Sequence, residues 1–350
     1  MPLNVIVVGA GLGGLGAAIA LNCAGHHVQV IEKSGFLNEV SAAIHVAPNA
    51  TRILKVWGCD LDWRQPVHCE TLQVWDAKGN HIRTPVVTKE HQRTLDVHDE
   101  WVLTHRVDLH NALRATAAQE VDGRKVNIRL SSPVLSVDAE AGEVLIEGGT
   151  KYTADLIVGA EGIHSTRSWE PRARVSTGQN CYRFLIPVRK MRDNPPTANL
   201  LARTGLNGVH AFATQDRRLV MYPCRKGELL NVAGICPWGS KTEAGDESSW
   251  HNTGSASQLL ETFREFGEEL RETCRLAEDI PRRLELYNKL RYAHAVTVMM
   301  MSRTNDERRG DMLDELRQHV PSAELPHDMV AFTWPSDPMK EAARVVQAAL

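Results

Sequence analysis

Short apolar runs separated by a glycine-rich turn and a helical stretch organise the start of the chain. Residues 3–8 are a short apolar run typical of a strand buried on both faces, and the glycine-rich residues 9–14 follow directly. Residues 15–24 are rich in Ala and Leu with helical spacing, and residues 28–31 form a second apolar run ending at Glu32. The pattern predicts a strand, a turn, a helix and a strand within about thirty residues.

Further along the chain, the same patterns predict a mixed α/β architecture. Polar stretches at 86–100 and 239–256 are expected to be a mobile surface loop and a linker. We expect helices at 50–58, 107–120, 256–277 and 281–303, and a tail from Gly310 that is helical and then irregular. We expect a hairpin from 71–75 and 81–83, a small antiparallel meander over 125–153, a buried strand at 154–162, and strands at 182–188, 209–214, 219–223 and 229–236.

The glycine-rich turn has the residue types that bind a dinucleotide phosphate. Gly9 permits a tight turn, Gly11 lets the backbone approach a pyrophosphate, and Gly14 lets the helix pack closely on the strand. The helix N-terminus then presents free N–H groups to the phosphates, and Glu32 can accept hydrogen bonds from a ribose. A Gly-x-Gly-x-x-Gly match alone could be a simple turn, but here both strands, the helix and the acid accompany it. We therefore predict adenine dinucleotide binding.

Composition narrows the class of protein. The 350 residues favour two domains, and 40 basic against 43 acidic residues give a net charge of -3, which does not favour nucleic-acid or anionic membrane partners. No apolar run approaches about eighteen residues, and only two residues precede the first strand, so we expect neither a membrane span nor a signal peptide. Seven scattered cysteines without a Cys-x-x-Cys pair indicate free thiols. We expect a cytoplasmic protein without a metal site.

Four segments in this order resemble the FAD-dependent aromatic hydroxylases, the single-component flavoprotein monooxygenases of the salicylate and p-hydroxybenzoate hydroxylase type, and the fungal members in particular. The family usually has Gly where this chain has Ser41, and Asp where it has Glu161. The segments are 9–14 with Glu32, then 41–44 with Pro48-Asn49, then 105–110, and finally 155–167.

The resemblance implies a fold, cofactors and site residues. The fold would be the α/β fold of p-hydroxybenzoate hydroxylase: a Rossmann-like FAD-binding domain over 1–170 with an inserted hairpin at about 67–100, a substrate-binding sheet lobe over 171–238, and a helical segment over 256–350. FAD and NAD(P)H would be the cofactors, and the enzyme, a monomer or homodimer, would hydroxylate or dearomatise a phenol-like small molecule in secondary metabolism. The implied FAD contacts are Gly9, Gly11, Gly14, Glu32, Lys33, Ala43, Arg106 and Glu161, and the implied catalytic pair is Arg183 and Tyr222.

Three of these residues also have a plain structural interpretation. Arg106 could be a solvated flank of its helix, Glu161 a turn carboxylate, and Arg183 a solvent-facing strand residue. An inward Arg183 would instead bind a phenolate or carboxylate, with Tyr222 as a hydrogen-bonding helper.

One family motif has no counterpart in the sequence. The family carries a buried strand, a Gly-Asp motif and a helix whose positive end faces the flavin. The resemblance places this motif between the helix that ends near Leu276 and the helix that begins at Pro281, where only residues 277–280 stand. We therefore expect an unpaired sheet edge and weakened FAD binding. A non-redox isomerase or cyclase, or an inactive binding protein on the same scaffold, stays open as an alternative.

Overall fold

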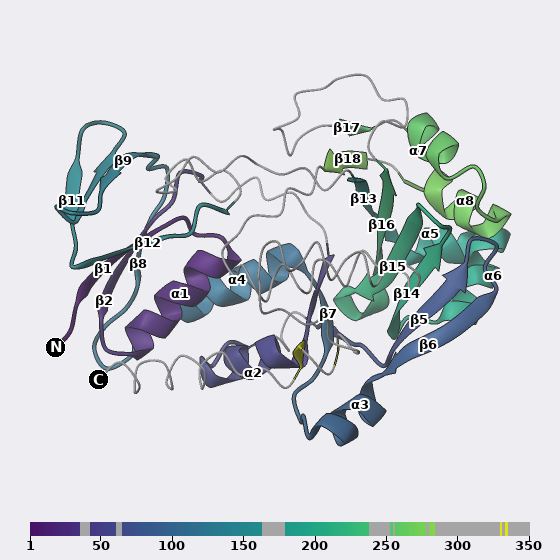
Figure 1. The fold of residues 1–350 in the computed structure, drawn as a ribbon, viewed down its shortest axis with the longest axis horizontal. Helices are drawn as coiled ribbons and strands as arrows, with labels where there is room; N and C mark the ends of the chain where they lie inside the picture. Colours follow the sequence, from purple (N-terminus) through teal and green to yellow (C-terminus); the bar gives the residue numbers. More distant parts are fainter. Residues whose placement is uncertain are drawn as a thin grey trace, which may run out of the picture.

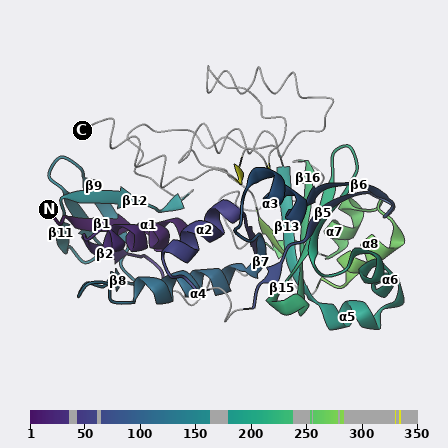
Figure 2. The ribbon, with the colours of Figure 1, turned by 90° about the horizontal axis from the view of Figure 1, so that it is seen from below.

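The structure is a computed structural model with two lobes side by side along its long axis (Figures 1 and 2). Helices α1 and α4 and the strands beside them make up the first lobe, and a larger sheet with α5 to α8 makes up the second. Strand β7 lies between the two, and β3 pairs with it. The residues described are 1–35, 43–60, 65–162, 179–237, 253–254, 256–277, 280–283, 330 and 333–334. Within them, no helix combines the length and the apolar character needed to cross a membrane.

The first lobe is built on a parallel sheet with the strand order β12-β1-β2-β8. Val5 and Val7 pack against Leu15 and Ala18 of α1 on one face, and the remaining face of β1 packs against a three-stranded meander. The sheet is therefore covered on both sides, as the apolar run of β1 predicts. The elements are β1 (Asn4–Val8), α1 (Leu12–Cys23), β2 (His27–Ile31), α4 (Arg106–Ala117), β8 (Asn127–Arg129), β12 (Leu156–Gly159), and the meander strands β9 (Val134–Asp138), β10 (Glu143–Ile146) and β11 (Lys151–Thr153).

An eight-stranded sheet forms the second lobe, in the order β17-β18-β13-β16-β15-β14-β5-β6. On β13, the alternate residues Tyr182, Phe184 and Ile186 point into a core that α5 to α8 complete, while Leu185 belongs to a different cluster on the opposite face. That opposite face meets the first lobe. The elements are β5 (Thr71–Asp76), β6 (His81–Val87), β13 (Gln179–Pro187), α5 (Val188–Asp193), α6 (Pro195–Thr204), β14 (Gly208–Ala213), β15 (Arg218–Cys224), β16 (Leu229–Pro237), β17 (Thr253–Gly254), α7 (Ala256–Thr262), α8 (Glu268–Arg275) and β18 (Ile280–Arg283).

A small sheet in the order β3-β7-β4 stands at the junction of the lobes. Its strands are β3 (Ala43–Val46), β7 (Val102–His105) and β4 (Val67–His68), and α2 (Pro48–Val56) follows β3 directly. Because β7 runs without a break into α4, this sheet places the start of α4 between the lobes.

Two predicted strand groups pair differently from our expectation. The hairpin of β5 and β6, expected as an insertion in the first domain, is hydrogen-bonded through β5 to β14 of the second sheet. Strand β8, expected in the meander, runs parallel to β2 in the first sheet. In both cases the local pattern is correct, and the pairing depends on residues far away in the sequence.

The stretch expected to be a mobile loop at 86–100 instead contains helix α3 (Thr88–Leu95). Thr88 donates its hydroxyl to the Cys69 carbonyl at 2.6 Å, and Asp96 ends the helix in the left-handed conformation. His91 packs against Trp334 of the C-terminal region, with ring centroids 6.1 Å apart. Tertiary contacts therefore hold a helix whose own sequence is mostly polar.

The C-terminal helices also differ from the prediction. The single helix expected over 256–277 is broken into α7 and α8, because the Gly267 N–H bonds to Ala77 O of the β5–β6 turn at 2.7 Å. Where we expected the next helix to begin at Pro281, β18 is a strand of the second sheet that pairs with β13 on one side and β17 on the other. The linker at 239–252 and most of the region after 283 lie outside the described residues.

Strand β12 is the outermost strand of the first sheet. In the described part of the chain it pairs with β1 alone, and Leu156 is 40% exposed. The unpaired edge expected from the absent family motif stays a prediction, because the structure describes only part of the chain.

Candidate functional site

The glycine turn after β1 has the shape that a pyrophosphate requires. Gly9 has a φ of +101°, and a Cβ on it would lie 2.6 Å from Ala160 O, while a Cβ on Gly14 would overlap the Gly9 carbonyl. Both positions therefore need glycine for close packing. A Cβ on Gly11 would meet nothing within 4 Å, so the space beside this residue is open to a ligand. The roles expected of the three glycines fit this geometry.

Glu32 lies at the end of β2, next to the glycine turn. Its carboxylate accepts hydrogen bonds from the Ala10 N–H at 2.6 Å and from the Ser34 N–H at 2.9 Å. These bonds fix the carboxylate at the place where a ribose would meet the turn, and each oxygen keeps a further lone pair for a hydroxyl. Lys33 is exposed beside it.

Of two more predicted residues, Glu161 lies beside this turn and Arg106 begins helix α4. Glu161 follows the end of β12, and its backbone nitrogen would lie 3.2 Å from a Cβ on Gly9. Arg106 is the first residue of α4 and is partly buried. The glycines, Glu32 and Glu161 are therefore brought together by the ends of three adjacent parallel strands.

Sequence reasoning missed His110, whose side chain bonds to the backbone of the glycine turn. His110, on α4 and 2% exposed, bonds through Nε2 to the Ala10 carbonyl at 2.7 Å. Since a carbonyl only accepts, Nε2 donates. His110 stood inside the third family-like segment, but nothing in the local sequence indicated its partner 100 residues away.

Ala43 lies at the junction, where side chains of the second sheet hold it. Its N–H donates to Asn231 Oδ1 at 3.1 Å, and its carbonyl accepts from the Tyr222 hydroxyl at 2.8 Å. Tyr222, expected to assist catalysis, therefore directs its proton at the backbone of the first lobe. Asn231 was not predicted, although a buried Asn within a strand is itself a signal that a polar partner exists.

Arg183 lies on the face of the second sheet that meets the first lobe. It stands between Tyr182 and Phe184, which point into the helix-covered core, so strand alternation places it opposite them. Ala233 of β16 is its cross-strand partner. This position fits the expected role of Arg183 better than a solvent-facing position on the outer side of the lobe.

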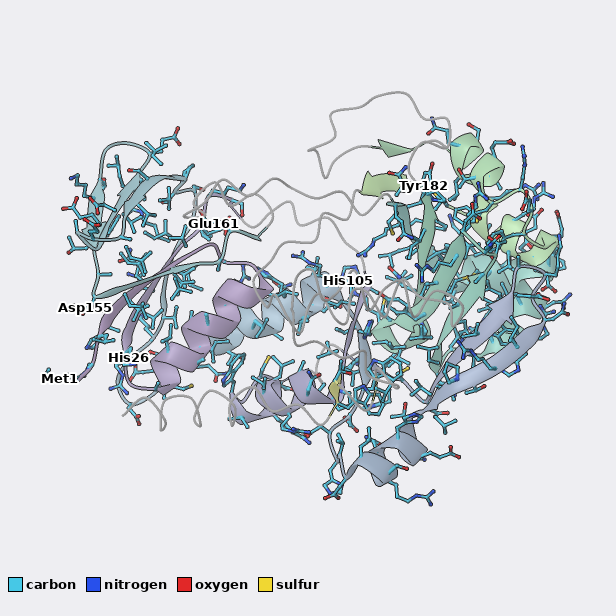
Figure 3. The ribbon with its side chains drawn as sticks, in the orientation of Figure 1. Met1, His26, His105, Asp155, Glu161 and Tyr182 are labelled. Atoms are coloured by element: carbon cyan, nitrogen blue, oxygen red, sulfur yellow. The ribbon has the colours of Figure 1, made fainter. Side chains whose placement is uncertain are left out.

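An ion pair joins the lobes at the start of α4. Arg225 Nε and Nη2 bond to the two carboxylate oxygens of Asp108 at 2.8 and 2.9 Å, and Asp108 is 4% exposed. Arg225 and Lys226 both have positive φ, 49° and 53°, so a strained turn presents this arginine. His105 lies between the lobes (Figure 3), and burial, with a further contribution from the charge of Arg225, lowers the pKa of its imidazole.

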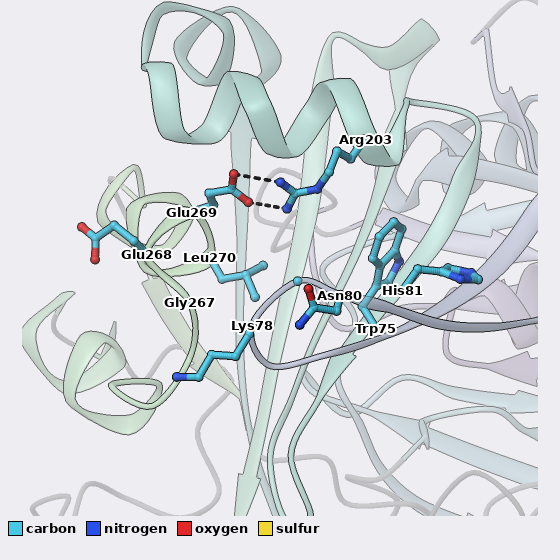
Figure 4. A pocket seen from close by; sticks show the side chains of 10 residues that line it. Trp75, Lys78, Asn80, His81, Arg203, Gly267, Glu268, Glu269 and Leu270 are labelled. Carbon is cyan, nitrogen blue, oxygen red and sulfur yellow. Dashed lines mark hydrogen bonds and ion pairs between the residues drawn. The ribbon is translucent and has the colours of Figure 1, made fainter.

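A surface pocket of about 570 Å³ lies elsewhere, beside the β5–β6 turn and α8 (Figure 4). Trp75 and His81 line one side, and a bidentate ion pair between Arg203 and Glu269 lies across it. None of the predicted site residues lines this pocket, so it is separate from the glycine turn and from the junction.

The comparisons with known proteins agree with this geometry. The family described as FAD binding domain matches residues 2–265. The chain belongs to this family. Its relatives include FAD-dependent monooxygenases and hydroxylases, so it is a flavoprotein monooxygenase of the aromatic hydroxylase type, as the sequence predicts.

Two curated relatives show the extent of the similarity. Hispidin-3-hydroxylase of Neonothopanus nambi is 32% identical over 295 residues, covering 79% of this chain and 68% of the relative. The FAD-dependent monooxygenase cfoG of Aspergillus candidus is 30% identical over 313 residues, covering 82% of this chain and 68% of the relative. This flavoprotein therefore spans about two thirds of the length of these two relatives.

Solved structures show the same fold. CtdE in complex with FAD superposes with a TM-score of 0.69 at 16% identity and covers 99% of both chains. A salicylate hydroxylase substrate complex gives a TM-score of 0.62 at 19% identity, covering 81% of this chain and 68% of the other. The fold expected from the sequence, that of p-hydroxybenzoate hydroxylase, is confirmed.

Proposed function

We propose that this flavoprotein is an NAD(P)H-dependent monooxygenase that hydroxylates or dearomatises a phenol-like small molecule in secondary metabolism. The observation that carries the proposal is the position of Arg183, on the sheet face that meets the FAD-binding lobe. The relatives named as hispidin-3-hydroxylase and as 3-hydroxybenzoate 6-hydroxylase, the latter from Polaromonas naphthalenivorans, support a phenolic substrate.

The neighbours of Arg183 suit a flat apolar ring. Its cross-strand row continues through Ala233, Val220, Ala211 and Val74, all on the same face of the sheet. The row therefore has four small or branched apolar side chains between Arg183 at its β13 end and the exposed Arg83 at its β6 end. An aromatic ring would lie on the apolar part, and its phenolate or carboxylate would reach Arg183.

Each part of the chain then has a separate task. FAD, when bound, supplies the chemistry that takes electrons from NAD(P)H and activates O2. The open space at Gly11 and the carboxylate of Glu32 would hold its pyrophosphate and ribose. Arg183 would lower the pKa of a phenol by stabilising its anion, which makes the ring richer in electrons. The apolar row would exclude water from the ring.

FAD titration tests the cofactor part of the proposal. Purified protein, freed of flavin and titrated with FAD in a calorimeter, should show saturable binding, and the loaded protein should consume O2 with NADH or NADPH. Because the sequence lacks the family's Gly-Asp motif, and β12 pairs with β1 alone among the described residues, we expect less than stoichiometric retention of FAD after purification. Saturable FAD binding without any O2 consumption over a panel of phenols would instead favour the alternative of a non-redox enzyme or binding protein on this scaffold.

An Arg183→Met variant tests the substrate part. Removing a charge-assisted hydrogen bond should raise KM for phenols that carry a ring carboxylate by about tenfold or more, with FAD affinity unchanged. Arg83→Met is the matched control, because Arg83 is exposed on β6 of the same sheet. Equal KM values for wild type and Arg183→Met would remove Arg183 from substrate binding.

A further inference from the structure

Ala43 is held at both of its backbone polar groups by two neighbouring side chains. Asn231 and Tyr222 are direct cross-strand partners on β16 and β15, so their side chains stand next to each other on one face. One accepts from the Ala43 N–H and the other donates to its carbonyl, at 3.1 and 2.8 Å. Both bonds are buried, since Ala43 is 3%, Asn231 2% and Tyr222 8% exposed.

This arrangement takes the place of a neighbouring strand. Strand β3 pairs with β7 on one side, and within the described residues no strand pairs with its other side. The two side chains of the second sheet satisfy the backbone of Ala43 on that side. They therefore fix where β3 begins relative to the sheet that carries Arg183.

We infer that Asn231 and Tyr222 are positioning residues that hold the Ala43 backbone, and with it the cofactor-side segment, at a fixed distance from the substrate sheet. The inference rests on the proposed function, because it assigns the fixed distance a role in the reaction between cofactor and substrate. Neither residue needs to touch the substrate for this role.

The polar bonds set this position more strictly than apolar packing does. Two hydrogen bonds to one residue fix both its translation along the sheet and its orientation, because each weakens steeply when the geometry departs from linear. A misplacement of about 1 Å between reacting groups can cost on the order of a hundredfold in rate. Loss of the two bonds should therefore reduce productive turnover in a protein that still folds.

The same sheet offers a matched control for this inference. Asn180 on β13 is 1% exposed, as buried as Asn231, but it lies on the opposite, helix-covered face, and among the described residues its side-chain amide has no hydrogen-bond partner. Asn180→Leu changes the same residue type in the same sheet at the same burial, and it leaves the junction intact.

The first measurement needs no cofactor. Amide hydrogen exchange at Ala43 in the flavin-free protein should be about tenfold faster or more in Asn231→Leu, because the buried acceptor is lost. Asn180→Leu should leave that exchange rate unchanged. Asn231→Asp keeps an oxygen acceptor and should restore much of the protection. Unchanged exchange in Asn231→Leu would overturn the inference.

The second measurement uses the FAD-loaded protein and the ratio of product formed to NAD(P)H oxidised. Asn231→Leu and Tyr222→Phe should lower this ratio by about tenfold at similar rates of NAD(P)H oxidation, and Asn180→Leu should not. If Asn231→Leu shows fast exchange but an unchanged ratio, the positioning role is wrong. If wild type binds no FAD, the proposed function fails, and the positioning role fails with it, while the exchange data still report on the bond from the Ala43 N–H to Asn231.

Discussion

Acid should destabilise the second lobe through His210, which lies on β14 and is 2% exposed. Its Nδ1 accepts a hydrogen bond from the Trp75 indole N–H at 3.3 Å, so the imidazole must be neutral at that nitrogen. Burial lowers the pKa of His210 from its ordinary value of 6.5 to about 4. A proton on Nδ1 would remove the acceptor and place a charge in the core.

The sign of the effect follows from the two pKa values. Between about pH 4 and pH 6.5 the unfolded chain binds a proton at this histidine and the folded chain does not. The stabilisation is therefore complete above the unfolded pKa and is lost as the pH falls toward the folded pKa. At about 1.4 kcal/mol per pKa unit, the free energy of unfolding should fall by about 2 kcal/mol between pH 7 and pH 5 on account of His210.

Urea unfolding followed by circular dichroism over this pH range measures the effect. His210→Asn keeps an oxygen near the Nδ1 position for the indole and cannot titrate, so its unfolding free energy should fall less steeply toward acid. His81→Asn is the control, since His81 is exposed and stacks edge-on against the same indole at 5.1 Å. A pH dependence in His210→Asn as steep as in wild type would refute this reasoning.

Four further variants test other parts of the structure. Gly11→Val should fold, because its Cβ meets nothing within 4 Å, but its FAD affinity in calorimetry should fall by about tenfold or more. Gly14→Ala should unfold at a lower urea concentration, because its Cβ overlaps a backbone oxygen. Equal FAD affinity for Gly11→Val and wild type would disprove the assignment of the glycine turn as the pyrophosphate site. Arg225→Met should cost about 2 kcal/mol in urea unfolding by leaving the buried Asp108 carboxylate without its guanidinium. Trp334→Ala should cost about 3 kcal/mol, since this 3% exposed ring packs against two other aromatic rings; no change in the urea midpoint would contradict that contact.

The sequence predicts the cofactor turn well because its determinants are local. Gly9, Gly14 and Glu32 act within one strand–turn–helix–strand unit, where spacing alone fixes the geometry. The family-like segments extend the prediction to other parts of the first lobe, and the alternation of apolar and polar residues predicts most strands of the second.

The junction between the lobes could not be predicted in the same way. The bond between Ala43 and Asn231 joins residues 188 apart, and the Arg225–Asp108 pair joins residues 117 apart. No local pattern reports which buried asparagine or aspartate faces which partner. The predictions of a loop at α3 and of a helix at β18 were wrong for the same reason, since an aromatic contact and strand pairing with β13 override the weak local preference.

Helix α4 connects the second lobe rigidly to the glycine turn of the first. Its first turn holds the second lobe through Asp108 and Arg225, and its next residues hold the phosphate turn through His110 and Ala10. A helix is stiff along its axis, so a displacement of the Arg225 turn is transmitted to the glycine turn rather than absorbed between them. Any opening of the lobes that releases product must therefore leave α4 in place. Otherwise it also shifts the glycine turn, and with it the dinucleotide site.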